Sequence, residues 1–303
     1  MSTVTKSTLF PANLVSEVFN KVTGHSSLAK LSGAKPVSFC GDDIFTFSID
    51  GEVSVVGESG AKPAGGATVA SKQMRPIKVV YQSRVSDEFM KASEEKRIEI
   101  LSTYSEGMVK KIARALDIMA MHGNNPATGS ASGIIGNNHL DYVVANYSSG
   151  ANKITLGHDS SAVDANIEEA IAKVEDAEKS VTGIVIAPAI RTSMAALTQN
   201  SGERKYPDFA FGAYPANLGG AVLDVNSTVS ANSEGARVYV GDFANAFRWG
   251  FAEEIPLEVI EFGNPDGGSY DLKQANEVLL RTEAFIGWAF LDEAAFAEVE
   301  QGE

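Results

Sequence analysis

The amino-acid sequence predicts an α+β fold in which one long helix packs against antiparallel strands. Three observations predict it: a helical apolar pattern over residues 94–122, alternating strand patterns at residues 255–260 and 278–286, and a turn-forming segment at residues 263–269 between those strands. A further region, residues 151–249, alternates helix and strand signals. We therefore expect a body made of the helix and the strand pair, and a compact second region of alternating helices and strands.

Composition allows a large core and disfavours several classes of protein. The chain has 303 residues, of which 44% are hydrophobic, and its net charge of −14 disfavours binding to a phosphate backbone. Cys40 is the only cysteine, which excludes an intrachain disulfide and a cysteine-based metal site. No apolar run approaches the roughly 20 residues of a membrane span, and residues 1–6 lack a signal-peptide pattern. We expect a cytosol-like compartment.

The first part of the chain is expected to form an extended arm followed by a long loop. Residues 14–22 are amphipathic, and a strand pattern follows at residues 43–49. Five glycines between Gly51 and Gly66 are too dense for a central strand, so this segment is predicted to be a loop. The return limb of that loop is predicted at residues 74–86, where apolar and polar side chains alternate.

The sequence contains near-matches to catalytic and metal-binding motifs, and each of them fails. Residues 57–62 lack the spacing of a phosphate-binding loop, and Pro63 prevents the helix that follows the serine of a nucleophile elbow. The four histidines lack metal-ligand spacing, and the acidic pairs at residues 42–43, 168–169 and 253–254 lack the pattern of a calcium loop. We expect no catalytic residue, no cofactor and no metal, and therefore no enzyme.

The long helix has the most regular pattern. Ser93 is a suitable N-cap, Glu94 and Glu95 suit the positive end of the helix dipole, and the helix is expected to end at His122. At about 1.5 Å per residue it forms a rod of roughly 40 Å, which suits a scaffold for a broad subunit. One apolar stripe is predicted from Ile98, Leu101, Tyr104, Met108, Ile112, Leu116 and Met119.

The region that follows is expected to fold compactly. The pattern predicts two helices, two strands and one ordered loop rich in glycine, proline and aromatic residues. In chain order these are a helix at residues 164–180, a buried strand at 183–187, a helix at 190–199, the loop at 206–220 and a strand at 237–243.

The order of these parts resembles that of tailed-bacteriophage major capsid proteins with the Hong Kong 97-type fold. The resemblance covers essentially the whole chain. It rests on several segments that occur in the same order, since no single segment is diagnostic. The segments are residues 10–19 (FPANLVSEVF), 24–29 (GHSSLA), 58–63 (ESGAKP), 84–90 (RVSDEFM), 241–250 (GDFANAFRWG), 253–260 (EEIPLEVI) and 278–288 (VLLRTEAFIGW).

The resemblance implies a division into four parts. These are an N-terminal arm at residues 1–49, an extended loop called the E-loop at 50–84, a peripheral P-domain with the spine helix at 85–150 and 250–289, and an axial A-domain at 151–249 and 290–303. Subunits of that family form hexamers and pentamers that close into an icosahedral shell around double-stranded phage DNA.

The same resemblance implies where the protein acts and with what. The chain is expected in the virion capsid, after assembly in the cytoplasm of the bacterial host. A separate scaffolding protein, a portal and a decoration protein are candidate partners. DNA is expected to be enclosed without sequence-specific binding, and no membrane partner is expected.

Six charged residues are candidates for contacts between subunits, because an arm and a loop that bury little surface alone must pair with neighbours. The alternative is that these charges only keep the loop soluble, since an exposed ion pair contributes roughly 0–1 kcal/mol. Both interpretations stay open from the sequence. The six residues are Glu52, Glu58, Lys62, Lys72, Arg75 and Arg84.

Two other functions compete with a phage shell. An encapsulin-like bacterial shell that encloses an enzyme cargo has the same fold, but the long arm before the loop and the absence of an evident cargo-docking helix weigh against it. A soluble α/β hydrolase built on residues 160–250 is the second alternative. A monodisperse monomer of about 32 kDa in gel filtration would favour the hydrolase.

We predict that subunits are not covalently cross-linked. Some family members join subunits by an isopeptide bond between an E-loop lysine and a P-domain asparagine. Lys62 and Asn264 are the nearest equivalents, and neither lies in a convincing motif. Denaturing electrophoresis of assembled particles checks this: we expect one band near 32 kDa, and a ladder of heavier bands would contradict it.

Overall fold

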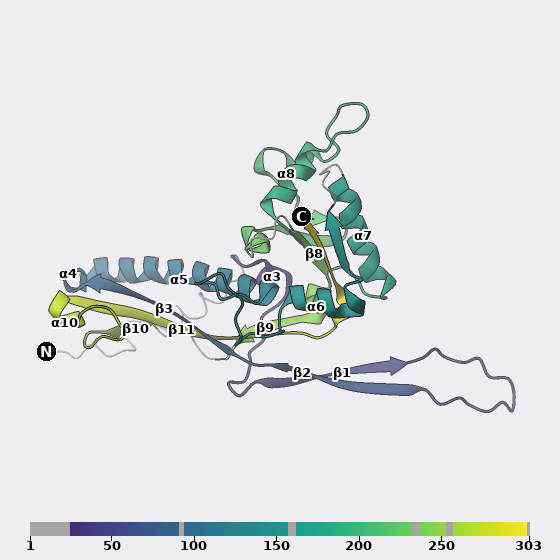
Figure 1. Cartoon of the computed structure of the whole chain (residues 1–303), viewed down its shortest axis with the longest axis horizontal. Coiled ribbons are helices and arrows are strands. Elements are labelled where there is room, and N and C mark those ends of the chain that lie inside the picture. Colours follow the sequence, from purple (N-terminus) through teal and green to yellow (C-terminus); the bar gives the residue numbers. More distant parts are fainter. Residues whose placement is uncertain (1–24, 91–93, 157–161, 232–236, 253–256, 302–303) are drawn as a thin grey trace.

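The computed structural model shows an elongated molecule with a spine, an upper domain and a projecting hairpin (Figure 1). In the spine, helix α5 (Glu94–His122) lies along strands β3 (Ile77–Ser86) and β11 (Glu277–Phe290). The upper domain rises from one end of the spine, and the hairpin projects beyond it. The structure describes residues 25–90, 94–156, 162–231, 237–252 and 257–301.

The predicted long helix is confirmed. Helix α5 has 29 residues, which at about 1.5 Å each gives a rod of about 43 Å. Tyr104 is half-buried and donates its hydroxyl to the carbonyl oxygen of Leu280 at 3.3 Å. The predicted N-cap Ser93 and the side chains of Ile98 and Leu101 lie outside the described residues. Four members of the predicted stripe are buried: Met108, Ile112, Leu116 and Met119.

Strand β11 is the longest described strand, and it organises the spine sheet. On one side it pairs antiparallel with β3, from Glu277 opposite Ser86 to Ile286 opposite Ile77. On its other side it pairs first with β10 (Leu257–Ile260) and then with β9 (Phe247–Phe251). The predicted antiparallel pair of residues 255–260 and 278–286 is confirmed, although residue 255 lies outside the described residues.

The projecting hairpin corrects one prediction. It consists of β1 (Asp42–Asp50) and β2 (Gly66–Met74), paired antiparallel along their whole length. The strand predicted at residues 74–86 is confirmed as β3 at residues 77–86, but its assignment as the return limb of the loop is wrong, because β3 pairs with β11 in the spine sheet and β2 is the return limb. Pro76 separates the two strands. The strand pattern of β2 is weak because glycine and alanine occupy several of its positions.

The base of the hairpin is fixed to the body, and the rest is not. Met74 packs with Val37 and Ala289 in a small buried cluster. At Gly41 the backbone takes a left-handed φ of 87°, which a glycine adopts without strain. Beyond this base, the described side chains of β1 and β2 are exposed or only partly covered.

The upper domain contains the predicted mixed sheet. Its strand order is β4-β12-β8-β5-β7-β6, with β12 parallel to β4 and antiparallel to β8. Helix α7 (Val163–Asp176) packs against β12, β4 and β8. The strands are β4 (Lys153–Leu156), β5 (Gly183–Ile186), β6 (Asn217–Leu218), β7 (Ala221–Val225), β8 (Arg237–Gly241) and β12 (Phe296–Gln301).

Two helices of the upper domain end earlier than predicted. Helix α7 ends at Asp176 rather than at residue 180, because Glu178 takes a left-handed φ of 58°. Helix α8 (Pro188–Ala196) begins at its proline, which suits a first helical position, and ends three residues before the predicted residue 199. Leu197 is extended there, and Thr198 forms a strand-like bridge with Arg204.

Part of the predicted arm belongs to the body. Within residues 1–49, α3 (Ser27–Leu31) is buried, with Leu28 fully covered, because its apolar side chains pack into the main core. The amphipathic segment at residues 14–22 lies outside the described residues. The other short helices are α4 (Asp87–Met90), α6 (Leu140–Asn146), α9 (Phe243–Ala246) and α10 (Leu272–Ala275), with 3-10 turns at Tyr147–Ser149, Pro207–Gly212, Ser227–Ser230 and Glu293–Ala295.

Two buried tryptophans lie opposite each other in the pairing of β9 with β11. The indole of Trp249 donates to the carbonyl of Ser32 at 3.0 Å, and that of Trp288 donates to the carbonyl of Asn138 at 2.8 Å. Both polar atoms are therefore satisfied inside the core.

Among the described residues, no helix has the length and apolar character needed to cross a membrane.

We predict that Gly250→Ala destabilises the subunit by about 1–3 kcal/mol or more. An added Cβ would lie 1.6 Å from the carbonyl oxygen of Lys35, whose backbone is hydrogen-bonded to Trp249. Denaturant unfolding of the purified chain measures the change. Gly220→Ala is the matched control, since nothing lies within 4 Å of a Cβ at that position. Equal stability of the two variants would contradict the prediction.

Candidate inter-subunit surfaces

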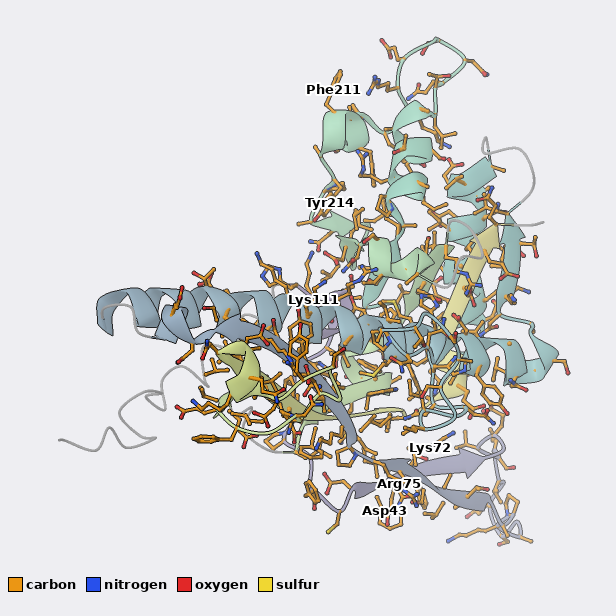
Figure 2. All side chains as sticks on the ribbon, turned by 60° about the vertical axis from the view of Figure 1, so that its left-hand side comes forward. Asp43, Lys72, Arg75, Lys111, Phe211 and Tyr214 are labelled. Atoms are coloured by element: carbon orange, nitrogen blue, oxygen red, sulfur yellow. The ribbon has the colours of Figure 1, made fainter. Side chains whose placement is uncertain are left out.

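The hairpin carries an apolar face that its own subunit leaves open. Residues opposite each other in an antiparallel pair share a face, so Phe45 and Phe47 lie beside Val69. These side chains are 73%, 67% and 60% exposed. Figure 1 shows the hairpin projecting from the body, and Figure 2 labels Asp43, Lys72 and Arg75 near its base. An apolar stripe of this kind on a surface indicates an interaction site.

The loop at residues 51–65, which joins β1 to β2, is also exposed. Val53 and Val55 are 95% and 103% exposed. Three of the predicted contact residues, Glu52, Glu58 and Lys62, lie in this loop, and no side-chain hydrogen bond or ion pair joins them to the described part of the chain. The structure leaves these three charges available to another molecule, as an inter-subunit role requires.

Two other predicted contact residues lie at the base of the hairpin and have partners in their own chain. The ammonium group of Lys72 lies 2.6 Å from Glu293 Oε1. Arg75 donates from Nε to Gln73 Oε1 at 2.6 Å. Both pairs are partly or fully exposed, so each contributes little to stability. A role for Lys72 and Arg75 between subunits stays a prediction.

Arg84 is engaged within its own subunit. Its guanidinium donates to both carboxylate oxygens of Asp266, at 2.7 and 2.5 Å, and to Asn264 Oδ1 at 2.9 Å. It also reaches the carbonyl of Tyr270 and the carboxylate of Glu277, each at 3.2 Å. The hydrogen bond from Arg84 lowers the pKa of the Asp266 carboxyl. Arg84 therefore fixes the turn between β10 and α10.

The two cross-link candidates lie far apart in one subunit. The loop with Lys62 is at the tip of the hairpin, and the turn with Asn264 is at the opposite end of the spine (Figure 1). The Asn264 amide is held at both ends, since Oδ1 accepts from Arg84 and Nδ2 donates to the carbonyl of Gly268 at 2.6 Å. A bond between them would therefore require two copies of the chain.

A buried polar cluster joins the spine to the upper domain, and the sequence analysis missed it. Arg237 Nη1 lies 2.5 Å from Glu298 Oε1 and 3.0 Å from Asp141 Oδ1. Asp141 also accepts from the hydroxyl of Tyr239 and lies 2.9 Å from His122 Nδ1. The cluster lines an open cavity of about 480 Å³. The sequence signal was weak: Arg237 is a charge at the start of an apolar strand pattern, and Glu298 shares its strand with Glu300 and Gln301.

The pKa values of two acids of this cluster are shifted in opposite directions. Burial, together with the nearby negative charge of Asp141, raises the pKa of Glu298 to about 8. Burial also acts on Asp141, but its hydrogen bond to His122 and the charges of His122 and Arg237 hold the pKa of Asp141 below its usual value. Asp141 thus carries the negative charge that the Arg237 guanidinium faces.

A second buried carboxylate, Asp117, fastens the start of the described chain to the spine. It accepts from the hydroxyl of Ser26, from the backbone N–H of Ser27 at 3.0 Å, and from that of Leu28 at 3.3 Å. From the upper domain it accepts the Thr228 hydroxyl at 3.0 Å. Burial raises the pKa of Asp117 to about 6. An aspartate between two apolar residues of a helix is the only sequence signal for this site.

We predict that Glu298→Gln flattens the pH dependence of subunit stability. The folded state holds the Glu298 proton more tightly than the unfolded chain does. Its contribution is therefore complete below about pH 4.5 and is lost as pH rises through about 8. Denaturant unfolding across this window should show a steeper decline for the wild type than for the variant. Glu168→Gln, on the exposed side of α7, should keep the wild-type slope. An unchanged slope in Glu298→Gln would contradict the prediction.

Comparisons with known proteins agree with this geometry. A family model described as the phage capsid family matches residues 7–300. A chain from Mycobacterium phage Ogopogo is 30% identical, with a TM-score of 0.77 and 92% of each chain covered. A chain from Gordonia phage Cozz is 24% identical, with a TM-score of 0.75, and the match covers 92% of this chain and 87% of that one. No match is found among curated proteins.

A structure with a much lower sequence identity has the same fold. The capsid of an empty GTA particle, computed with C5 symmetry, contains a chain that is 13% identical, with a TM-score of 0.60 and coverage of 92% and 90%. At this identity the likeness shows the fold alone. The predicted Hong Kong 97-type fold is confirmed, and the chain belongs to the phage capsid family as a major capsid protein that forms an icosahedral shell.

Proposed function

We propose that copies of this chain group as hexamers and pentamers and close into an icosahedral shell around double-stranded phage DNA. The main observation behind this proposal is the hairpin β1–β2, because its apolar face is exposed to solvent in the single subunit. An isolated two-stranded hairpin is marginally stable in water, so a neighbouring surface must complete it. Membership of the phage capsid family and the capsid structures of the same fold support the shell.

The free edges of the hairpin favour association with further copies rather than with a small ligand. Among the described residues, β1 pairs only with β2, so each strand presents one edge of unpaired N–H and C=O groups. Such edges, next to exposed Phe45 and Phe47, suit another polypeptide. The same contact repeats between all subunits of a shell, and many weak contacts then add to a stable assembly.

The division into domains follows the strands. We assign the E-loop to the hairpin, residues 42–74, and residues 77–86 to the P-domain, because β3 pairs along β11. The A-domain takes residues 151–249 and 290–303, which include the six-stranded sheet. The arm is proposed for the residues before the hairpin, and its described part includes α3, which packs in the body.

The net charge of −14 supports a shell that encloses DNA without sequence-specific binding. The function is then structural rather than enzymatic. Assembly in the host cytoplasm with a separate scaffolding protein, a portal and a decoration protein belongs to the same proposal.

Electron microscopy of the full-length chain expressed in bacteria tests the shell, and Phe47→Ser tests the observation behind it. We expect closed particles from the wild type and few or none from the variant. Since the Phe47 side chain is 67% exposed, the variant subunit should fold with nearly unchanged stability. Thr46→Ser, on the other face of the hairpin, is the matched control and should assemble normally.

Two results would contradict the proposal. A monodisperse monomer of about 32 kDa in gel filtration under all salt conditions would exclude a shell. Particles from infected cells that hold folded protein cargo and no nuclease-protected DNA would exclude the DNA-enclosing function while leaving the fold unaffected.

A further inference from the structure

The last residue of the spine helix, His122, has an acceptor at each of its ring nitrogens. Its Nδ1 lies 2.9 Å from Asp141 Oδ2, and its Nε2 lies 2.8 Å from the carbonyl oxygen of Thr228. The side chain is fully buried. Asp141 belongs to α6, which packs against α5, whereas Thr228 belongs to the 3-10 turn Ser227–Ser230 of the upper domain. His122 therefore connects the spine to the upper domain.

Neither of these acceptors supplies a hydrogen to the ring. A backbone carbonyl only accepts, and an ionised carboxylate does the same. The neighbours of Asp141 favour its ionised form, since Oδ1 accepts from the Tyr239 hydroxyl and lies 3.0 Å from Arg237 Nη1. Burial raises the pKa of Tyr239, so this hydroxyl keeps the hydrogen that it donates. A neutral imidazole has a single N–H and satisfies only one acceptor, so the arrangement requires a proton on both nitrogens of His122.

The position of His122 in the fold favours the positive charge that two ring protons give. It ends a helix of 29 residues, and the C-terminal end of a helix dipole is negative. The only nearby guanidinium in the described chain, that of Arg237, is shared among three carboxylates. The titratable and charged groups around His122 are Asp117 on α5, Asp141 on α6, His139 just before α6, Lys153 on β4, Arg237 and Tyr239 on β8, and Glu298 and Glu300 on β12.

A second histidine of the same cavity, His139, has the opposite arrangement. Its Nδ1 accepts from the backbone N–H of Tyr142 at 3.2 Å, and in this way it caps helix α6. A ring nitrogen that accepts carries no proton, so the ring of His139 is neutral. Burial lowers the pKa of His139, which is the direction expected for a ring that stays neutral. The cavity therefore holds one neutral imidazole and one histidine whose partners require a cation.

We propose that His122 is a proton-operated latch, which holds the upper domain to the end of the spine helix while both ring nitrogens are protonated and releases Thr228 when one proton is lost. The proton leaves to solvent through the open cavity that His122 lines. The remaining N–H stays with the carboxylate of Asp141, since a charged acceptor binds it more strongly. The unprotonated nitrogen then faces the carbonyl oxygen of Thr228, and two acceptors repel each other. The latch is therefore closed at lower pH and opens as the pH rises.

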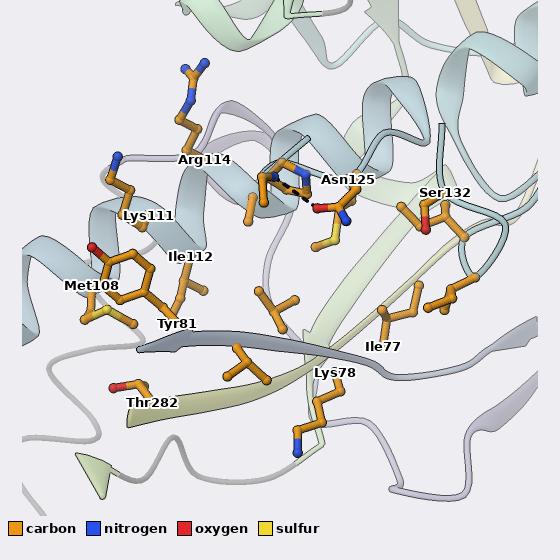
Figure 3. Close-up of a pocket in the computed structure, with 18 residues that line it drawn as sticks. Ile77, Lys78, Tyr81, Met108, Lys111, Ile112, Arg114, Asn125, Ser132 and Thr282 are labelled. Carbon is orange, nitrogen blue, oxygen red and sulfur yellow. Dashed lines mark hydrogen bonds between the residues drawn. The ribbon is translucent and has the colours of Figure 1, made fainter. Parts of the chain in front are cut away.

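Another hollow beside the spine helix supplies an internal reference. An apolar groove of about 530 Å³ lies between α5 and β3, with Met108 and Ile112 of the helix on one wall and Ile77 of the strand on the other (Figure 3). No histidine and no carboxylate of the described residues lines this groove. The backbone of β3 is therefore a segment on which the latch has no direct effect.

Nitrogen-15 NMR of the chain labelled at its four histidines measures the protonation of each ring directly. Magic-angle spinning serves for particles and for unassembled chain, so the measurement does not depend on the proposed shell. Signals are assigned by their loss in His122→Gln and in His139→Gln. On raising the pH from about 5 to about 8, the range in which an imidazole ordinarily changes its charge, we expect His139 to show an unprotonated nitrogen first, while His122 still has two protonated nitrogens.

Hydrogen exchange of the wild type and of His122→Gln, compared at each pH, measures the release of the upper domain. Glutamine keeps one donor group and cannot gain a charge. At the low end of the range, the turn at Ser227–Ser230 should exchange about tenfold more slowly in the wild type, because the variant lacks a charged donor to Thr228. At the high end the two chains should exchange this turn equally, and β3 should exchange equally at every pH.

Two controls separate the latch from other titrations. Asp117 also binds Thr228, and burial raises the pKa of Asp117 to about 6, so only the difference between wild type and variant at one pH is compared. His139→Gln is the matched variant, since it changes the same residue type in the same cavity. Its difference from the wild type should change little with pH.

Two results would overturn the latch. An unprotonated nitrogen in His122 over the whole pH range would show that the ring is neutral and that Asp141 holds the proton between them. Two protonated nitrogens, combined with an exchange difference that does not vary with pH, would show that the charge of His122 has no part in holding the upper domain. The latch is a property of the single subunit, so neither result decides whether the chain forms particles, which electron microscopy tests.

Discussion

Burial of one carboxylate, Asp117, determines how the parts of this subunit meet. The side chain lies on the spine helix, receives two backbone N–H groups from the start of α3, and receives a hydroxyl from Thr228 in the upper domain. A buried acceptor of this kind is costly unless donors surround it. The donors come from two separate parts of the chain, so the carboxylate is satisfied only when both lie against the spine helix.

Strand β11 connects the spine to the upper domain. Its first part pairs with β3 and β10 in the spine, and its last residues pair with β9 beside the upper domain. After a 3-10 turn the chain enters the six-stranded sheet as β12. The Arg237–Glu298 pair then links β8 to β12 in the interior of that sheet. A force on the peripheral end of the spine is therefore transmitted through continuous backbone into the upper domain.

The sequence predicted elements whose signal is local and periodic. The apolar stripe on α5 and the alternation of residues 278–286 were sufficient to predict this helix and this strand, because each pattern lies within a single element. The return strand β2 was missed since its small residues give little alternation. The polar clusters were missed because their partners are distant in the chain: Ser26 and Asp117 are 91 positions apart. Arg84 binds Asp266, 182 positions away, a pairing that only the tertiary fold reveals, and its predicted contact with a neighbour stays a prediction.

The hairpin is anchored at its base by Met74 and free along the rest of its length. The proposed shell would place the same chain in surroundings of fivefold and of sixfold symmetry, which differ in the angle between neighbours. A two-stranded ribbon bends and twists more readily than the packed sheets behind it. We expect the difference in local curvature to be absorbed in the ribbon, so that one rigid core serves every position on the surface of the particle.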